Sequence, residues 1–435
     1  MTHRRRLHPL LSVPFAGSGL LVCLLSPAPC LAQAATTDPA TAASTTGSIA
    51  DAVGLKLSLR NGAWTQDREL GSDDLTVVGG LRGRLAPRFS PVLDGFAEGY
   101  VQTDSARGTR ADLTEGWIRL SSGTLELRAG RQIIVWGRAD RLNPTDNLGG
   151  RDYTLLTASD DDQRQGPLTV LARWGSGNWT FDGLWLPEFR PDRYPLDRQR
   201  PGVTILPDAQ PRDAGQFAAK LDNSGGNLDF SLSYFDGIDR TRDFVPVSQT
   251  SPIIQQQFPR IRVIGADLAG AAGPVGYRAE AAVTFVRGLP GVFRKQSNFW
   301  LVAGFDTPAP GGWNLNLQYS YRHVFGWRDP QALANPIARG VAQLDAAVTN
   351  QLDRDQHGAT VRLARSWLSE TLDFELASIV YFTRGDAAIR PRLGYRINDN
   401  LRLSLGADLF VGPSLSYFGR VRSLSGGWLQ LTSGF

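Results

Sequence analysis

The sequence predicts an all-β protein, a transmembrane antiparallel β-barrel of about 18 strands. A 16-stranded barrel is the fallback, because bacterial barrels prefer even strand numbers. Three observations predict the barrel: an N-terminal segment typical of exported proteins, long segments that alternate apolar and polar residues, and connections that alternate between short and long. Such a barrel places its short turns in the periplasm and its long loops outside the cell. We therefore expect the protein in the outer membrane of a Gram-negative bacterium.

The first 34 residues have the layout of a secretory signal peptide. Arg4 to Arg6 supply positive charge, Leu10 to Leu25 are mostly apolar, and Ala32-Gln33-Ala34 resembles a cleavage site. A transmembrane anchor is the alternative, but the apolar run is short and no stop-transfer flank follows it. Residues 35–50 are small, polar and aperiodic, which predicts a flexible periplasmic lead-in. The barrel is then expected over residues 51–435.

The composition excludes several classes of protein. Cys23 and Cys30 both lie in the predicted leader, so the mature chain is expected to hold neither a disulfide nor a cysteine-ligated metal. The 46 basic residues less the three leader arginines leave 43, against 42 acidic residues, which is a net charge of about +1. A nucleic-acid partner is not expected at this charge. After Asp51 no apolar stretch is long enough for a membrane helix.

Strict alternation predicts the barrel strands, and Trp313 to Arg322 is the clearest case. Its odd-numbered positions are Trp, Leu, Leu, Tyr and Tyr, and its even-numbered positions are Asn, Asn, Gln, Ser and Arg. Residues 276–286, 389–397 and 401–411 alternate in the same way. Their apolar faces are about ten residues long, enough to cross a bilayer when tilted. A soluble sandwich also alternates, but its strands are usually about five or six residues long.

Aromatic residues lie at the ends of these strands, where an outer-membrane barrel carries its interfacial girdles. The alternative is that they are ordinary core aromatics. The residues are Trp179, Trp185, Tyr277, Trp313, Tyr321 and Tyr395.

The connections between the predicted strands alternate in length. The short ones lie near residues 86–91, 121–123, 175–178, 223–227, 270–274, 307–312, 366–370 and 398–400. The long ones include 132–166, 187–212, 236–258, 324–354 and 411–426. Short turns at one end and long loops at the other are typical of an outer-membrane barrel.

The chain ends in an amphipathic segment, WLQLTSGF. Leu429, Leu431 and the terminal Phe435 share one parity, although Ser433 replaces the usual apolar residue between them. This ending resembles the sorting signal of outer-membrane β-barrels. The resemblance implies the barrel-assembly machinery as a partner that recognises Phe435, and the predicted barrel itself implies the lipid of the outer membrane as a second partner.

Lipid forces the strands to close on one another, because every backbone N–H and C=O in a bilayer needs an internal partner. The charged residues, 20% of the chain, must then point inward. At about 18 strands the interior is too wide for side chains alone to fill. Something must occupy the lumen or pass through it.

The segment GRQIIVWGRADRLNPTDNL, residues 130–148, marks where the lumen is expected to be narrowed. Leu125, Leu127 and Ala129 share the outward parity, which would place Arg131 on the lipid side at a cost of roughly 2–4 kcal/mol at the midplane. Either a bulge at Gly130 resets the register, or Arg131 lies at the interface and reaches to water. We favour the bulge and expect the chain to leave the membrane through residues 136–137.

A loop of about 30 residues follows, too long for an ordinary connection unless it is functional or disordered. Its Arg and Asp residues are nearly balanced, which predicts an ordered insert that folds into the lumen as a constriction. The candidate constriction residues are Gln132, Trp136, Arg138, Asp140, Arg141, Asn143, Asp146, Asp161 and Arg164.

The same segment resembles the GRQ…WG…NP element of a family of Gram-negative outer-membrane barrels loosely grouped with alginate-export and porin-like barrels. The matching residues are Gly130, Arg131, Gln132, Trp136, Gly137, Asn143 and Pro144, and the segment LSLGADLFVGPSLSYFGR is similar to the family's last hairpin. The resemblance implies a barrel that passes or exports a molecule across the outer membrane. Whether the matching residues contact a solute or only set a strand end and pin a loop stays open.

Inward-facing arginines on consecutive strands form a second constellation, a predicted ladder. Rings of Arg bias a pore towards anions. A guanidinium group also forms bidentate hydrogen bonds with carboxylate and phosphate groups. Asp373, Glu375 and Asp408 lie on the same strands, so internal charge pairing is the alternative. The ladder consists of Arg322, Arg362, Arg390, Arg392, Arg396 and Arg402.

The sequence gives no support for an enzyme, a cofactor or a metal site. His323 and His357 are the histidines outside the leader, and Ser320 lies three residues before His323, which on a strand places the two on opposite faces. A lipid hydrolase is therefore disfavoured. The expected function is a channel that passes or exports a solute or polymer, anionic if the ladder attracts it. The alternative is a plugged barrel that serves as a binding or assembly partner of a periplasmic export system.

Overall fold

The computed structural model describes residues 53–66, 75–194, 204–207, 211, 215–248, 253–288 and 291–435. The predicted signal peptide (1–34) and lead-in (35–50) lie outside the described residues.

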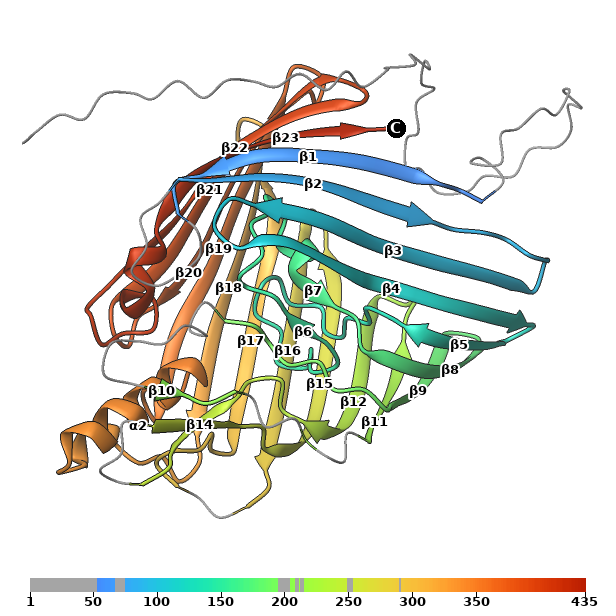
Figure 1. Ribbon diagram of the computed structural model, residues 1–435. Helices are drawn as coiled ribbons and strands as arrows, with labels where there is room; N and C mark the ends of the chain where they lie inside the picture. Colours follow the sequence, from blue (N-terminus) through green and yellow to red (C-terminus); the bar gives the residue numbers. More distant parts are fainter. Residues whose placement is uncertain are drawn as a thin grey trace, which may run out of the picture. The chain divides into compact units, whose positions relative to one another are not determined.

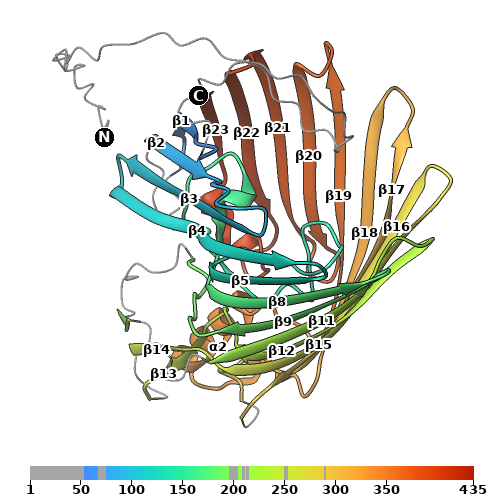
Figure 2. The same ribbon diagram turned by 90° about the vertical axis from the view of Figure 1, so that its right-hand side faces the viewer.

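Eighteen strands form one antiparallel sheet that closes on itself, which confirms the predicted barrel and its strand number (Figures 1 and 2). Each strand pairs with its neighbour in chain order, and β23 pairs with β1 to complete the ring. The barrel strands are β1 (Lys56–Trp64), β2 (Thr76–Leu85), β3 (Leu93–Asp104), β4 (Gly108–Ser122), β5 (Leu125–Arg131), β8 (Leu168–Ser176), β9 (Trp179–Leu186), β11 (Gln216–Asn223), β12 (Leu228–Ile238), β15 (Arg260–Ala272), β16 (Val275–Val286), β17 (Asn298–Ala309), β18 (Trp313–Val324), β19 (Asp355–Trp367), β20 (Leu372–Tyr381), β21 (Asp386–Asn398), β22 (Leu401–Val411) and β23 (Gly426–Gly434).

The two ends of the barrel differ as predicted. Every connection at one end is short, from the link between β2 and β3 to the link between β21 and β22. The other end holds all the long loops, together with two short links at residues 105–107 and 382–385. We call the first the turn end and the second the loop end.

The long loops carry the remaining elements. They are β6 (Gly150–Arg151), η1 (Asp160–Gln163), β7 (Arg164–Gln165), β10 (Thr204–Ile205), β13 (Asp243–Pro246), β14 (Ile253–Gln257), η2 (Pro330–Ala332), α2 (Pro336–Val348) and η3 (Gly419–Leu424). Helix α2 begins at Pro336 because the Asn335 side chain accepts hydrogen bonds from the first free amides, a standard N-cap. Figure 1 shows α2 and β14 together at the loop end. Among the described residues, none of the helices is long and apolar enough to span a bilayer.

The two faces of the strands separate as the alternation predicts. On β18, Leu317 and Tyr319 are 36% and 43% exposed, whereas the alternate residues Gln318 and Ser320 are buried. The buried set is polar because it faces the lumen, and the exposed set is apolar because it faces hydrocarbon. A closed barrel with this outer surface is an outer-membrane protein.

The terminal residue, Phe435, helps to close the barrel by pairing with β1. Phe435 and Leu57 exchange backbone hydrogen bonds of 2.9 and 3.1 Å, and the Phe435 side chain is 66% exposed. Recognition of this ending by the assembly machinery stays a prediction.

The predicted bulge at Gly130 is wrong. The register runs without a shift along both partners of β5, from Gly116–Arg131 to Ser122–Leu125 and from Leu125–Trp174 to Arg131–Leu168. Arg131 therefore keeps the outward parity. It is the last residue of β5, so it lies at the rim rather than the midplane, where its guanidinium bonds Glu188 at 2.8 Å and the Gly166 carbonyl at 3.1 Å. The bulge lies in the neighbouring ladder, between Glu98 and Gly99.

The predicted exit through Trp136 and Gly137 is also wrong, because the chain turns into the barrel after Arg131. Trp136 is 3% exposed and packs against inward-facing wall residues that include Leu171, Leu184 and Phe235. This apolar patch on the inner wall gives the indole a dry site that water outside the barrel would not.

The assignment of faces can be tested with an added charge. Leu317→Arg places a charge on the lipid side near the middle of β18, and we expect it to lower the free energy of unfolding by roughly 2–4 kcal/mol. Urea titration of the protein refolded in lipid vesicles measures this. Asn314→Arg, on the lumen face of the same strand, is the control and should change stability little; equal losses in both variants would contradict the assignment.

Candidate functional site

The loop between β5 and β8, residues 132–167, lies inside the barrel. It contains the short β6–β7 pair and η1. Its polar contacts reach wall strands on every side of the lumen, namely β1, β2, β4, β11, β12, β15, β16, β18, β20, β21 and β23. We call this segment the internal loop. The prediction that it folds into the lumen is confirmed.

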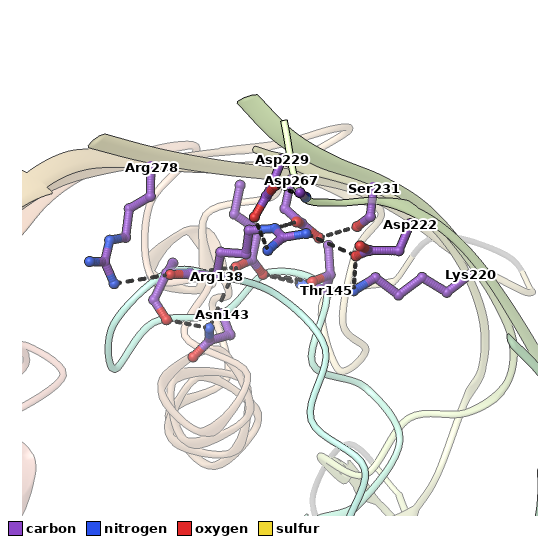
Figure 3. A network of polar contacts seen from close by, with 12 residues as sticks. Arg138, Asn143, Thr145, Lys220, Asp222, Asp229, Ser231, Asp267 and Arg278 are labelled. Atoms are coloured by element: carbon purple, nitrogen blue, oxygen red, sulfur yellow. Dashed lines mark hydrogen bonds and ion pairs between the residues drawn. The ribbon is translucent and has the colours of Figure 1, made fainter. Parts of the chain in front are cut away.

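Arg138 ties the beginning of the internal loop to three neighbouring wall strands (Figure 3). Its guanidinium lies 2.6 Å from Asp267, 2.9 Å from Asp222 and 3.8 Å from Asp229. These carboxylates project from β15, β11 and β12. An arginine offers five N–H donors in a rigid fork, so a single side chain can bridge all three strands.

Glu280 of β16 fixes the next turn of the loop. Its side chain is 1% exposed and accepts hydrogen bonds from the backbone amides of Arg138 and Ala139 at 3.1 Å and of Thr145 at 2.7 Å. The Thr145 hydroxyl adds a fourth at 2.8 Å, and the Asn143 side-chain amide adds a fifth at 3.4 Å. A buried carboxylate is tolerated when its charge is matched by donors in this way.

Gly137 is required for this close approach. It adopts a φ of +91°, and a Cβ added there would lie 2.3 Å from the Glu280 carboxylate. Any other residue at this position would strain the backbone and push the loop off the wall. The glycine of the WG pair therefore has a structural reason.

Arg141 carries the loop across to the opposite wall. It is the central residue of a γ-turn, with a φ of +67° and a hydrogen bond of 2.8 Å from the Leu142 amide to the Asp140 carbonyl. Its guanidinium bonds Glu375 of β20 at 2.9 Å and Asp160 at 3.2 Å. The unusual backbone thus aims the charge at the wall.

Two aspartates of η1 secure the far end of the loop. Asp160 accepts hydrogen bonds of 2.6 and 2.7 Å from Arg390 of β21. Asp162 is buried and is bonded by Arg60 of β1, by Arg82 of β2 and, at 2.6 Å, by the Thr157 hydroxyl. The loop is therefore held from both sides of the barrel.

A cavity of about 1350 Å³ remains beside the internal loop. Its walls are one side of the loop, the inner faces of β16 to β22 and parts of the loop-end segments. Twelve cationic side chains line it against nine acidic ones, which leaves a formal excess of three positive charges. The cationic residues are Arg138, Arg141, Arg151, Arg164, Arg240, Arg278, Lys295, Arg322, Arg362, Arg390, Arg392 and Arg420.

Most of the predicted constriction residues border this cavity. They are Arg138, Asp140, Arg141, Asn143, Asp146, Asp161 and Arg164. Asp146 is buried and bonds Arg164 at 2.9 Å, whereas the Asp161 side chain is 89% exposed. The loop thus presents both signs of charge to the space beside it.

Gln132 and Trp136 do not border the cavity. Gln132 is 1% exposed and donates its amide to the Thr169 carbonyl at 2.8 Å, which joins the end of β5 to β8. Trp136 packs in the wall patch described above. Both residues therefore fix the strand end and the loop.

The predicted arginine ladder divides in two. Arg322, Arg362, Arg390 and Arg392 line the cavity. Arg396 and Arg402 lie towards the turn end, outside the cavity lining, and Arg402 is paired with Asp373.

The cavity-lining arginines have two kinds of partner. Arg362 bonds Glu375 at 2.7 Å, and Arg390 bonds Asp160 and Asp408. Arg322 instead lies 4.1 Å from the centre of the Trp300 ring and donates to the Asn350 carbonyl at 2.8 Å.

Arg392 resembles Arg322, since it donates to the Ala158 carbonyl at 3.2 Å. These neutral partners leave both charges uncompensated by any carboxylate within 4.0 Å in the part of the chain that the structure describes.

Several residues that hold the site were not among the predicted ones. Glu280, Asp267 and Asp222 anchor the internal loop, and all three lie on the inward face of their strands. The parity of the strands was the signal that could have found them. Strand parity could not have identified Asp160 and Asp162, because they lie in η1 within the loop and not on a strand.

The histidines lie where the alternation places them. Ser320 is buried on the inner face, whereas His323 and His357 lie on the outer face near the loop end, where His323 Nδ1 is 2.7 Å from Asp355 and His357 Nδ1 is 2.6 Å from the Tyr319 hydroxyl. The Ser320–His323 dyad of a hydrolase is therefore absent. The described residues contain no group of three His, Cys, Asp or Glu side chains that could hold a metal ion.

A buried acidic cluster holds β13 and α2 at the loop end. Asp345 of α2 accepts the Phe244 amide at 2.7 Å, and Asp243 of β13 accepts the Lys295 amide at 3.0 Å. Burial raises the pKa of both carboxyl groups, that of Asp243 to about 7, and the neighbouring Asp239 carboxylate adds to the effect on Asp243. Lys295, which is ion-paired with Asp239, opposes the rise.

Solved structures with a similar fold are outer-membrane proteins. OpdK of Pseudomonas aeruginosa is 12% identical, with 88% of this chain and 97% of that chain covered and a TM-score of 0.53. OccK2 (OpdF) of the same organism, solved in complex with glucuronate, is 12% identical over 88% and 96% of the two chains, with a TM-score of 0.52. OccAB3 of Acinetobacter baumannii is 9% identical over 88% and 98%, with a TM-score of 0.52. At these identities the likeness shows a shared fold.

No protein-family model and no curated protein matches the chain. The resemblance carried by the GRQ…WG…NP element therefore stays a prediction.

The anchoring role of Glu280 can be tested by proteolysis. Glu280→Ala removes the acceptor of five loop hydrogen bonds and leaves the backbone amides without a partner, so we expect the internal loop to detach and its arginines to become sensitive to trypsin. The control is Asp373→Asn, which breaks a pair between two wall strands, β20 and β22, without touching the loop. Cleavage between residues 138 and 164 in the first variant alone is the expected result; a resistant Glu280→Ala loop would contradict the role.

The buried acidic cluster predicts a pH dependence. A carboxyl group whose pKa is raised on folding stabilises the folded loop-end segments while it is protonated, and this stability is lost as the pH rises through the folded pKa. We expect α2 to loosen progressively as the pH rises from about 4, the ordinary pKa of an aspartate, through about 7, the pKa of Asp243 in the folded protein. The fluorescence anisotropy of a dye attached at Ile337→Cys, in a chain with both natural cysteines changed to Ser, measures this.

Asp345→Asn is the matched variant, because it keeps the acceptor for the Phe244 amide and removes one of the two charges. It should flatten the pH profile. An anisotropy that rises with pH, or a profile that the variant leaves unchanged, would contradict the assignment.

Proposed function

We propose that the protein is an outer-membrane channel for small anionic solutes. The solute passes beside the internal loop, through the cavity bordered by β16 to β22. The loop sets the size of the passage, and the excess of positive charge sets its preference for anions.

The observation that carries this proposal is that Arg322 and Arg392 line the cavity without a carboxylate partner among the described residues. Both line the cavity, and their partners are carbonyl oxygens and an indole ring, which do not cancel the charge. A carboxylate passing through the cavity can bond them without breaking an existing ion pair. The paired arginines, Arg362 and Arg390, would have to exchange one carboxylate for another.

Carboxylated solutes are the class that this arrangement fits. The guanidinium fork bonds both oxygens of a carboxylate at once. The similar barrel OccK2 was solved with glucuronate, a sugar acid, which supports the same chemistry here. Export and the passage of a polymer are not part of the proposal, because the loop crosses the full width of the lumen.

The many contacts of the internal loop favour a second candidate function. A loop bonded to wall strands on every side of the lumen could close the barrel, which would then serve as a binding or assembly partner for a periplasmic export system. A closed barrel conducts no ions, so the experiment below separates the two.

Ion selectivity in planar bilayers tests the proposal. Under a salt gradient the protein should conduct with a reversal potential that indicates anion preference. Arg322→Gln/Arg392→Gln should move this potential clearly towards the value for a non-selective pore, because it removes the two unpaired charges. Arg396→Gln/Arg402→Gln removes equal charge outside the cavity lining and should change it little.

Two results would count against the channel. The first is the absence of any conductance, which would favour the closed barrel. The second is an equal shift in both double variants, which would mean that net charge alone, and not these two positions, sets the selectivity.

A further inference from the structure

Three arginines gather around one carboxylate on the outer surface of the barrel. Asp236 of β12 lies 2.9 Å from Arg262, 2.7 Å from Arg287 and 3.3 Å from Arg260. Arg260 and Arg262 belong to β15, and Arg287 directly follows β16. We call these four residues the outer arginine cluster.

The cluster faces lipid and not the lumen. Arg262 pairs across the sheet with Asp236 on one side and with Phe285 on the other, and Phe285 is an exposed residue of the apolar outer face. The side chains of Arg262 and Arg287 are 53% and 45% exposed. Outward-facing charge in a barrel strand is unfavourable unless it lies near the membrane interface.

Along the strands, the cluster lies at the membrane interface on the loop-end side. Strand β15 begins at Arg260, β16 ends at Val286 and β12 ends at Ile238, so all four residues lie at the loop-end limit of their strands. Long loops of an outer-membrane barrel lie outside the cell. The cluster is therefore level with the headgroups of the outer leaflet.

The charges of the cluster are unbalanced. Three guanidinium groups against one carboxylate leave a formal excess of two positive charges. Another outward ion pair at this rim, Arg131 with Glu188, is balanced one to one. Like charges held this close together repel one another, and an anion from outside the protein would relieve the repulsion.

An exposed apolar surface flanks the cluster and continues below it. Phe217, Leu232, Ile264 and Phe285 are 57%, 57%, 55% and 47% exposed, and they lie on β11, β12, β15 and β16. Phe217 pairs directly with Asp236, so the apolar surface begins where the charges end. A ligand that fits both parts carries an anionic headgroup above hydrocarbon chains.

We propose that the outer arginine cluster binds a phosphorylated glycolipid of the outer leaflet. The phosphate accepts hydrogen bonds from Arg262 and Arg287, and the acyl chains lie against Phe217, Ile264 and Phe285. Phosphate suits the site because guanidinium groups bond its oxygens in pairs, and basic clusters at a membrane surface attract anionic lipid headgroups. This proposal rests on the fold and not on the channel function.

Native mass spectrometry of the full chain, released from the membrane in mild detergent, tests the proposal. The probe is bisphosphorylated lipid A, compared with lipid A from which both phosphates have been removed. The wild type should retain the phosphorylated lipid and not the dephosphorylated one. Arg262→Gln/Arg287→Gln should bind the phosphorylated lipid roughly 30-fold more weakly, from about 1 kcal/mol for each arginine at a membrane surface.

Arg131→Gln/Glu188→Gln is the matched control, because it removes the balanced pair at the same rim, and its lipid binding should equal that of the wild type. Heat-modifiable migration on gels reports folding in every variant. If the double variant does not fold, the single change Arg287→Gln, which lies outside the sheet, replaces it with an expected loss of roughly fivefold.

Three results would overturn the proposal. They are equal retention of lipid A with and without phosphates, unchanged binding in the folded cluster variant, and an equal loss in the control. A fourth overturning result can come from a separate titration of the lipid-bound protein with inorganic phosphate. If millimolar phosphate displaces the lipid completely, the site recognises free phosphate, and the lipid assignment is wrong.

Discussion

The internal loop is held in place by charge pairing with the barrel wall, and the form of the lumen depends on this pairing. From the loop, Arg138 and Arg141 pair with carboxylates of the wall. From the wall, Arg390 and Arg82 pair with carboxylates of the loop. The pairing therefore runs in both directions. A loop tethered only by apolar contact could slide along the wall, whereas charged hydrogen bonds fix its direction and its position.

Such pairing is effective here because of where it lies. A surface ion pair contributes little to stability, since water screens it and two side chains lose freedom. The loop contacts are partly or wholly removed from water, as the 1% exposure of Glu280 shows. Breaking one partner of a pair of this kind leaves the other without compensation, so each contact matters more than its net contribution suggests.

The fold and much of the interior could be predicted from the sequence, because apolar and polar residues that alternate over ten positions indicate a strand with two different faces. The alternation fixed the inward positions of Arg322, Arg362, Arg390 and Arg392, and it placed His323 and Ser320 on opposite faces. The path of the chain after Arg131 could not be predicted in this way. Residues 133–135 favour strand, but among the described residues no strand pairs with them. Trp136 instead packs in an apolar patch formed by strands that are far apart in the sequence.

The register at Gly130 shows a second limit. The cost of a charge facing lipid at the midplane favoured a bulge at Gly130 over the alternative, in which Arg131 lies at the interface. The strand in fact ends at Arg131, and Glu188, 57 residues away, pairs with it. Strand ends and partners distant in the sequence are tertiary facts that local alternation does not contain.

Hydrogen–deuterium exchange of the protein in lipid vesicles tests most directly whether the internal loop is bonded inside the barrel. The amides of Arg138, Ala139 and Thr145 donate to a buried carboxylate, so they should exchange far more slowly than those of an unstructured peptide. Exchange of these three amides at the rate of a free chain, while the strand amides stay protected, would show that the loop does not lie against β16 and would contradict the account.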